Sequence, residues 1–349
     1  ISARKEKKPV KILERTTYLD RLMRLKGTPD IKIITGLRRS GKSELLRQYI
    51  EKVKSSNTMV NIIYIDYADL AFEELRNYKK LYEYVEAHYI NGMDNMLFVD
   101  EVQMCDKFEL AINSFHNSRK YDIYITGSNA FLLSSDLSTL FTGRYIETPV
   151  FPFSLSEFCA YFGKSDKDSS LLEKYLREGG LSGSYLYAES SDKTSYIKDV
   201  FNTLIKRDLI EKYHILEESR MDSLVDFLMD NISNLTSPNK ISEFLEKNDK
   251  MANHVTIGNY LKYLCSAFLF YRVRRYDLKG KKYLETIEKY YLSDLSFRYA
   301  LLGSRNLDYG RAYENMVAIE LMRRGYEIYV GKLYQKEIDF VVIKQNEKI

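Results

Sequence analysis

The chain has 349 residues, enough for two or three domains, and its 45% hydrophobic and 29% charged residues are typical of globular proteins. It has no apolar run of roughly 18 residues and no apolar core at its start, which excludes a membrane-spanning helix and a secretory signal. Three widely spaced cysteines and four histidines exclude a disulfide framework and a zinc site and favour a reducing cytoplasm, while a net charge of +4 leaves a nucleic-acid partner open.

The first half of the chain alternates between strands and helices. A short amphipathic helix is predicted before residue 27, and the sequence GTPD at residues 27–30 ends it. Five short apolar strands follow at residues 31–35, 60–66, 96–100, 121–126 and 144–150, with helical segments at 43–53 and 70–90 between them. Apolar strands that alternate with helices indicate an α/β domain whose parallel sheet is covered on both faces.

The second half of the chain is mainly helical. Helices are predicted at residues 171–178, 194–213, 220–231, 241–247 and 256–267, and a two-stranded hairpin at 268–276 and 282–291 follows them. Helices followed by such a hairpin suggest a winged helix. A helix at 312–324 and two strand-like runs end the chain. We therefore predict five segments: an N-terminal helix (1–27), an α/β domain (28–163), a helical domain (164–236), a winged-helix domain (237–303) and a final domain (304–349).

Residues 36–43, GLRRSGKS, match the phosphate-binding loop (P-loop) pattern GxxxxGK[ST] at every fixed position, between a strand and a helix as the pattern requires. Its glycines allow backbone N–H groups to close around phosphate oxygens at the positive end of a helix dipole. Lys42 is expected to neutralise the outer phosphates and the Ser43 hydroxyl to ligate magnesium. At least one of the two loop arginines is expected to face solvent or a partner. The predicted nucleotide-binding residues are Gly36, Leu37, Arg38, Arg39, Ser40, Gly41, Lys42, Ser43 and Glu44.

The third strand ends in two adjacent carboxylates, within the sequence LFVDE at residues 97–101. Because buried carboxylates are unfavourable, the tip of this strand should open on a charged site. Asp100 is predicted to hold magnesium through water, and Glu101 to polarise the attacking water as a general base. The competing interpretation is a strand that simply ends in polar loop residues.

Three further residues each have two interpretations. Asn129, or its neighbour Ser128, follows the fourth strand and is a candidate catalytic sensor of the outermost phosphate, or else a helix cap. Arg144 is a candidate for stabilising charge in the transition state, in cis or from a neighbouring subunit, or else a surface arginine at a turn.

Together these residues resemble the AAA-type ATPases of the additional-catalytic-glutamate class, in which a glutamate directly follows the magnesium-organising aspartate. Within that class the chain is similar, over nearly its whole length, to a bacterial and archaeal group of ATP-binding proteins. The shared motifs are a GxRRxGKS loop (36–43), a strand ending in DExQ (97–103), ITGSNA (125–130), LFTGR (140–144) and PFSxxEF (152–158). The resemblance implies ATP and Mg²⁺ as ligands and the sheet order 5-1-4-3-2. Ser182 stands where the group usually has the proline of GGxP.

The resemblance also implies a winged helix followed by a domain similar to PD-(D/E)xK nucleases. Glu314 and Asp339 match the first two acidic positions of such nucleases, which hold a metal. The Glu/Gln-x-Lys pair of the next strand has no counterpart before Ile349, so the last domain is expected to be truncated and its nuclease site incomplete. The competing interpretation, which we favour over cleavage, is an acidic loop in a packing domain.

The hairpin of the predicted winged helix carries a group of basic residues. Such residues could neutralise DNA phosphates, while the competing interpretation is a solvated hairpin or an interface with the ATPase core. The candidate DNA contacts are Arg272, Arg274, Arg275 and Lys281.

Three functional hypotheses follow from these motifs. The first is an ATPase that uses Mg²⁺ and ATP hydrolysis to switch or move its C-terminal domains, with DNA as a candidate partner. The second is a DNA-binding or signalling module in which ATP is an assembly ligand with little turnover. The third is an ATP-coupled nuclease. A homo-oligomer is a further candidate assembly, a membrane partner is not expected, and the expected location is the cytoplasm.

Overall fold

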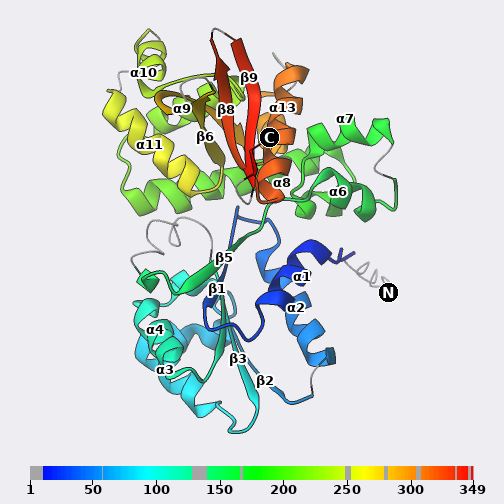
Figure 1. Cartoon of the computed structure of the whole chain (residues 1–349), viewed down its shortest axis with the longest axis vertical. Coiled ribbons are helices and arrows are strands. Elements are labelled where there is room, and N and C mark those ends of the chain that lie inside the picture. The colour runs from blue at the N-terminus through cyan, green and yellow to red at the C-terminus, as the bar shows by residue number, and fades with distance from the viewer. Residues whose placement is uncertain are drawn as a thin grey trace, which may run out of the picture.

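The computed structural model describes residues 11–56, 58–127, 140–165, 168–247, 253–278, 282–303, 308–334, 336–344 and 347–348. Figure 1 shows two lobes, an N-terminal lobe built on one sheet and a C-terminal lobe built of helices and a second sheet. None of the helices in these ranges is both long and apolar enough to cross a membrane.

The N-terminal sheet has five parallel strands in the order β2-β3-β4-β1-β5, which confirms the order expected from the resemblance. All five residues of β1 are buried, because the sheet is covered on both faces. The strands lie within a residue or two of their predicted positions, at β1 Ile31–Thr35, β2 Val60–Asp66, β3 Asp94–Asp100, β4 Asp122–Thr126 and β5 Tyr145–Pro149.

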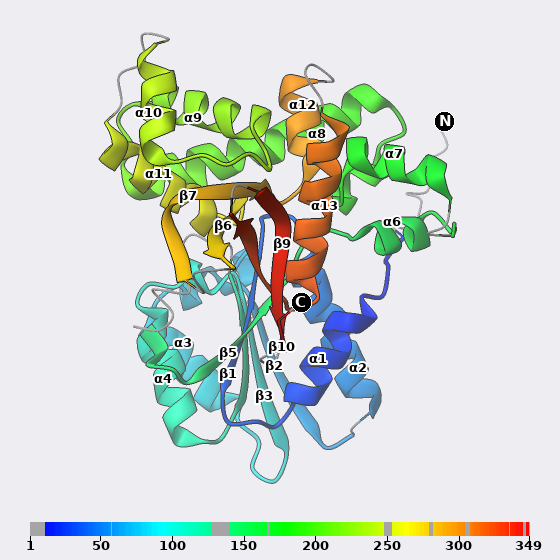
Figure 2. The ribbon, with the colours of Figure 1, turned by 45° about the horizontal axis from the view of Figure 1, so that its top comes forward.

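Helices cover both faces of this sheet, as Figure 2 shows. On one face α1 (Thr16–Leu25) and α2 (Lys42–Ser56) share a buried core with Ile34 and Phe98 of the sheet. On the other face, residues of α3 (Tyr78–Ala87) and α4 (Phe108–Ser118) share a core with alternate residues of the same strands. The described part of this lobe also has two short 3₁₀ turns, η1 (Leu70–Leu75) and η2 (Val102–Met104). The sequence interpretation missed α4.

Most helices of the C-terminal lobe share one large core, whereas the buried residues of α6 belong to a separate, smaller cluster. The predicted helix at 194–213 consists of α8 (Ser190–Thr203) and a π-helical segment, η4 (Leu204–Glu211). α6 and α12 were not predicted. The remaining elements are α6 (Leu155–Tyr161), α7 (Ser169–Glu178), η3 (Ser182–Leu186), α9 (Glu218–Asp230), α10 (Pro238–Glu246), α11 (His254–Ser266), α12 (Leu295–Leu302) and α13 (Tyr309–Arg323).

The second sheet joins strands from both sides of the domain boundary expected after residue 303. Its order is β10-β9-β8-β6-β7, and β6 pairs with β7 on one side and with β8 on the other. The predicted hairpin therefore is not a free wing, because β8 covers one edge of it. The strands are β6 (Phe270–Asp277), β7 (Lys282–Leu292), β8 (Glu327–Leu333), β9 (Lys336–Lys344) and β10 (Glu347–Lys348).

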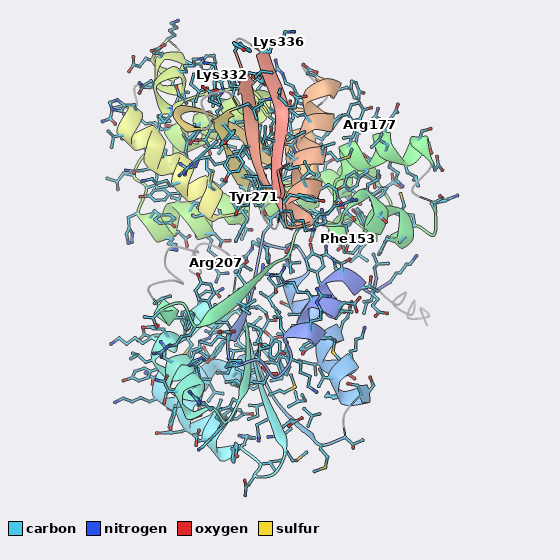
Figure 3. The ribbon with its side chains drawn as sticks, viewed as in Figure 1. Phe153, Arg177, Arg207, Tyr271, Lys332 and Lys336 are labelled. Carbon is cyan, nitrogen blue, oxygen red and sulfur yellow. The ribbon has the colours of Figure 1, made fainter. Side chains whose placement is uncertain are left out.

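The two lobes meet at the carboxyl edge of the N-terminal sheet. Leu37, which follows β1, is fully buried in the core of the C-terminal lobe. Phe151, which follows β5, stacks on Tyr271 of β6 with ring centroids 5.4 Å apart. Figure 3 shows Phe153, Tyr271 and Arg207 along this boundary. The loop that follows β1 is thus held between the lobes.

Candidate nucleotide-binding site

The P-loop links β1 to α2 and has a conformation that its glycines make accessible. Gly36 has φ +136°, and a Cβ there would lie 2.1 Å from the carbonyl oxygen of Val150. No side chain fits at that position. Gly41, with φ +93°, turns the chain into α2. The first residue of that helix is Lys42, so the loop ends at a helix N-terminus, where backbone N–H groups favour an anion.

Lys42 is buried, with 5% of its surface exposed. Its Nζ donates hydrogen bonds to the backbone carbonyls of Gly36, at 3.0 Å, and Leu37, at 3.1 Å. Burial lowers the pKa of this ammonium, although the negative charges of Glu101 and Asp100 act in the opposite direction. A buried cation whose hydrogen bonds, within the described part of the chain, go to neutral carbonyls favours an incoming anion.

Asp100 ends β3, and Glu101 follows it directly at the start of η2. The Asp100 carboxylate, 1% exposed, accepts a hydrogen bond from the hydroxyl of Thr126, and Ser43 also donates to it. Burial raises the pKa of Asp100, and these two hydrogen bonds oppose that shift. Glu101 adopts a left-handed backbone conformation, φ +55°, and its carboxylate accepts a hydrogen bond from Gln103.

Thr126, the last residue of β4, joins the two carboxylate residues. Its hydroxyl donates to Asp100 and accepts a hydrogen bond from the Glu101 backbone N–H at 3.1 Å. The sequence interpretation placed its candidate sensor two or three residues later, at Ser128 and Asn129, and both of these lie outside the described residues. The signal that it missed is a threonine at the end of a buried strand adjacent to β3.

The oxygens at this site fit a magnesium ion. Ser43 and Asp100 supply a hydroxyl and a carboxylate, the hard donors that Mg²⁺ prefers, and the buried carboxylate gains from a nearby cation. Among the described residues, no group of three or more His, Cys, Asp or Glu residues is arranged to hold a metal. Mg²⁺ in nucleotide sites usually takes one or two protein ligands and completes its shell with water and substrate phosphates.

Arg15, which the sequence interpretation did not single out, holds the back of the P-loop. Its guanidinium donates to the carbonyls of Ser40 and Phe151, each at 3.0 Å, and to the Glu157 carboxylate at 2.7 Å. Glu157 also forms a capping box with Ser154 at the start of α6. The PFSxxEF motif therefore has a structural purpose, since its glutamate anchors the arginine that holds the loop.

Glu157, the partner of Arg15, also contacts the C-terminal lobe. Arg323 of α13 lies 3.4 Å from the Glu157 carboxylate and donates to the carbonyl of Pro152 at 2.7 Å. Burial alone would raise the pKa of Glu157, but Arg15 and Arg323 outweigh it and hold the pKa below its ordinary value. A partly buried glutamate between two arginines thus connects the P-loop to α13.

Three other predicted nucleotide-binding residues, Arg38, Arg39 and Glu44, have different surroundings. Arg38 points to the C-terminal lobe, where its Nη1 lies 3.4 Å from the carboxylate of Asp208. Glu44 is 41% exposed and lies 3.9 Å from Arg47 on the same helix. Arg39 has φ +66°, a left-handed conformation that is uncommon for a residue with a side chain.

Arg144 lies far from the P-loop of its own chain. It precedes β5 at the amino edge of the sheet, where its carbonyl accepts a hydrogen bond from Ile31 and its side chain donates to Asn117. The loop leaves the opposite edge, one strand length of roughly 15 Å away at about 3.3 Å per residue. Arg144 therefore does not act in cis, because the parallel strands hold it at the wrong edge, and its role across a subunit interface stays a prediction.

The acidic pair expected from the nuclease resemblance is brought together around a lysine. Lys289 of β7 lies 2.7 Å from Glu314 and 3.8 Å from Asp339, and Glu337 binds it at 2.7 Å. The Tyr291 hydroxyl also donates to Glu314, at 2.7 Å. This lysine lies in the predicted hairpin, so the sequence interpretation did not connect it with the acidic pair. It neutralises carboxylates of α13 and β9 and so joins these elements to β7.

The candidate DNA contacts on β6 have different surroundings. Arg272 lies 3.7 Å from Glu288 of the adjacent strand, which offsets its charge. Arg274 is exposed and Arg275 is half-buried, while Lys281 lies outside the described residues. Because β6 is an interior strand of the sheet, these side chains project from a sheet face rather than from the tip of a wing.

Two family models match the chain. Residues 28–159 match an AAA domain, and residues 169–308 match a domain of unknown function, DUF8612. The gap between the two matches contains the boundary predicted at residue 163. The second match extends across the boundary predicted at residue 236, where the structure also has a continuous core.

Two relatives match along most of the chain. An uncharacterized protein of Haemophilus influenzae is 34% identical over 342 residues, which are 96% of this chain and 85% of that protein. An uncharacterized protein of Methanocaldococcus jannaschii is 28% identical over 360 residues, covering 97% of this chain and 78% of that protein.

A solved structure, the Walker-type ATPase of Pyrococcus abyssi, has the same overall fold. It superposes with a TM-score of 0.52 at 16% sequence identity, covering 86% of this chain and 99% of the other. The similarity therefore extends beyond the N-terminal sheet into the C-terminal lobe.

Proposed function

The chain belongs to the same family as its uncharacterized Haemophilus influenzae relative and carries an AAA domain at residues 28–159, and on that premise we propose that it hydrolyses ATP with Mg²⁺ and thereby repositions its C-terminal lobe. The observation that carries this proposal is the convergence of Lys42, Asp100 and Glu101 at one edge of the sheet, with Thr126 bonded to both acidic residues. A loop that served only to bind phosphate would not need the second carboxylate.

Each residue has a definite role in this proposal. Backbone N–H groups of the P-loop and the Lys42 ammonium bind the phosphates, and Ser43 and Asp100 hold the magnesium ion. Magnesium, when bound, neutralises charge that develops on the phosphate oxygens. Glu101 accepts a proton from the water that attacks the terminal phosphate. The Thr126 hydroxyl, which contacts both the Glu101 backbone N–H and the Asp100 carboxylate, holds these two residues in position.

The contacts of the loop with its surroundings support the proposed coupling to the C-terminal lobe. Leu37 packs in the core of that lobe, and Ser40 is bonded through Arg15 and Glu157 to Arg323. Because the second sheet joins strands on both sides of residue 303, we expect the C-terminal lobe to move as one body. A change in loop conformation on hydrolysis would therefore act on the lobe as a whole.

Glu101→Gln tests the catalytic assignment. The variant should keep ATP affinity within about threefold of the wild type and lose about 10²–10⁴-fold in turnover, the usual contribution of a general base. Phosphate release and equilibrium binding of ATP with Mg²⁺ measure the two quantities separately. Glu83→Gln, an exposed glutamate on α3, is the matched control and should leave both unchanged. Undiminished turnover in Glu101→Gln would overturn the assignment.

The same assay distinguishes the competing functions. Phosphate release from the wild type near background, and unchanged by duplex DNA, would support a module in which ATP is an assembly ligand. Release that rises with DNA and falls in Arg274→Ala would assign DNA contact to the exposed arginine of β6. Cleavage of DNA that is lost in Glu314→Gln would support the nuclease hypothesis over the packing interpretation.

A further inference from the structure

Arg38, the third residue of the P-loop, is bound by a carboxylate of the other lobe. Its Nη1 lies 3.4 Å from both carboxylate oxygens of Asp208, which is 170 residues later in the chain. The arginine side chain is 23% exposed and the aspartate side chain 6%. A phosphate-binding loop thus has one of its cations paired with a buried anion before any phosphate arrives.

Asp208 is held in this position by the packing of η4. Its neighbours Leu204, Ile205 and Leu209 are buried in the same core as Leu37 of the loop. η4 is π-helical, a rare conformation that is frequent at functional sites. Figure 3 shows Arg207, from the same segment, at the boundary between the lobes. The backbone that carries Asp208 is therefore fixed against the P-loop by apolar contacts, whichever partner its carboxylate has.

The carboxylate of Asp208 lies within the electrostatic field of the nucleotide site. Burial raises its pKa, the positive charges of Arg38, Arg207 and Lys42 lower it, and Glu101 raises it. Asp208 in turn acts on the pKa of Lys42. Among the charges that act on Asp208, that of Arg38 is the largest, so this ion pair is the main electrostatic link between Asp208 and the loop.

The terminal phosphate of a bound ATP would compete with Asp208 for the same arginine. A guanidinium binds phosphate through paired, charge-assisted hydrogen bonds, and Arg38 belongs to the loop that encloses the phosphates. A buried carboxylate that loses its cation is strongly destabilised unless its surroundings rearrange. Binding of a phosphate to Arg38 would therefore weaken the attachment of η4 to the loop.

We propose that Asp208 is a residue of the nucleotide site contributed by the C-terminal lobe, which holds Arg38 in the free protein and releases it to the terminal phosphate of ATP. This inference rests on the proposed function and specifies how the lobe senses the nucleotide. ADP lacks the phosphate that competes for Arg38, so the lobe distinguishes the two nucleotides through this one ion pair.

Asp208→Asn tests the competition directly. The variant removes the competing charge and keeps the side-chain shape, so it should bind ATP about tenfold more tightly, within the usual range of coupling between two sites, and ADP less than about twofold more tightly. In an Arg38→Ala background the same substitution should change ATP affinity by less than about twofold, because the contested cation is gone. Isothermal titration with ATP and ADP in the presence of Mg²⁺ measures these affinities.

Glu211→Gln is the matched control, since it removes a carboxylate from the exposed side of the same π-helical segment. It should leave both affinities unchanged. A folded Asp208→Asn variant with unchanged or weaker ATP binding would overturn the proposal, because a purely structural ion pair gives that result. If Asp208→Asn gave that result while Glu101→Gln still lost turnover, the role of Asp208 would be wrong and the ATPase assignment would stand. The two proposals can therefore be contradicted independently.

The wild-type protein provides a second measurement that does not depend on the variant folding. Amide hydrogen exchange at residues 204–211 should become faster on saturation with ATP and not with ADP, as η4 loses its ionic attachment. Equal protection of this segment with both nucleotides would contradict the proposal.

Discussion

Two buried lysines, Lys42 and Lys289, both have carboxylates around them, but they differ in what they bind. The Lys42 ammonium donates to two backbone carbonyls of its own loop, at 3.0 and 3.1 Å. The Lys289 ammonium lies 2.7 Å from each of two carboxylates, those of Glu314 and Glu337. One cation is held by neutral groups and the other by anions.

The pKa values of the two lysines reflect this difference. Burial lowers the pKa of both ammonium groups. For Lys289 the hydrogen bonds and charges of Glu314 and Glu337 outweigh burial, and the pKa is raised. For Lys42 burial outweighs Asp100 and Glu101, and the pKa is lowered. The lesson is that Lys42 gains from an additional anion, as a phosphate site requires, whereas Lys289 already has its anions.

The largest expected effect is that of Lys42→Ala on nucleotide binding. Removal of the cation that faces the outer phosphates should weaken ATP binding by more than about 100-fold, as expected when a charged hydrogen-bonding partner is lost from a buried site. Titration with ATP and Mg²⁺ measures the affinity. Lys54→Ala, an exposed lysine on the same helix, is the control. Wild-type affinity in Lys42→Ala would show that the P-loop is not the nucleotide site.

Lys289→Met should instead reduce stability. It leaves the carboxylates of Glu314 and Glu337 without their cation, and because these are partly exposed we expect a loss of about 2–3 kcal/mol, below the 3–5 kcal/mol typical of a fully buried pair. Urea unfolding measures this loss, with Lys336→Met as the control on the exposed end of β9. ATP turnover of the folded variant should be unchanged, and its loss would mean that the two lysines do not act independently.

Thr126→Val is expected to slow turnover about tenfold while ATP affinity changes by less than about threefold. The variant removes the hydroxyl that joins Asp100 to the Glu101 backbone, so the catalytic carboxylate loses its orientation. Thr148→Val on β5 is a close control, since that buried hydroxyl has no hydrogen-bond partner among the residues that the structure describes. Equal turnover rates for Thr126→Val and Thr148→Val would show that the Thr126 hydroxyl does not contribute to catalysis.

The smallest effect is the pH dependence that Glu157 contributes. Its folded-state pKa lies below the ordinary value of 4.5, so its stabilising contribution is present above that value and is lost as the pH falls through the folded-state pKa. Glu157→Gln should therefore have a lower Tm than the wild type at neutral pH, and the difference should shrink below pH 4.5. A difference in Tm that stays constant with pH would exclude ionisation of Glu157 as its cause.

Much of the N-terminal lobe could be predicted because its signals are local. The apolar runs of β1 to β5, the GxxxxGKS pattern and the Asp100–Glu101 pair each lie within a few consecutive residues, and the structure has them at the predicted positions. The C-terminal lobe was harder to predict. Its hairpin has the residue pattern of a wing, but pairing of β6 with β8 incorporates it into a larger sheet, and this pairing has no signal in the hairpin itself.

The sequence by itself determined the chemistry available to this protein: a loop that binds phosphate, a lysine and serine at its end, and two carboxylates on a neighbouring strand. Only the tertiary structure decided which distant residues complete the site. Arg15 meets Glu157 across 142 residues and Arg38 meets Asp208 across 170. Such contacts depend on how whole elements pack, and neither periodicity nor local spacing encodes that packing. The packing of whole elements likewise places Arg144 at the amino edge of the N-terminal sheet and Lys289 beside Glu314 and Asp339.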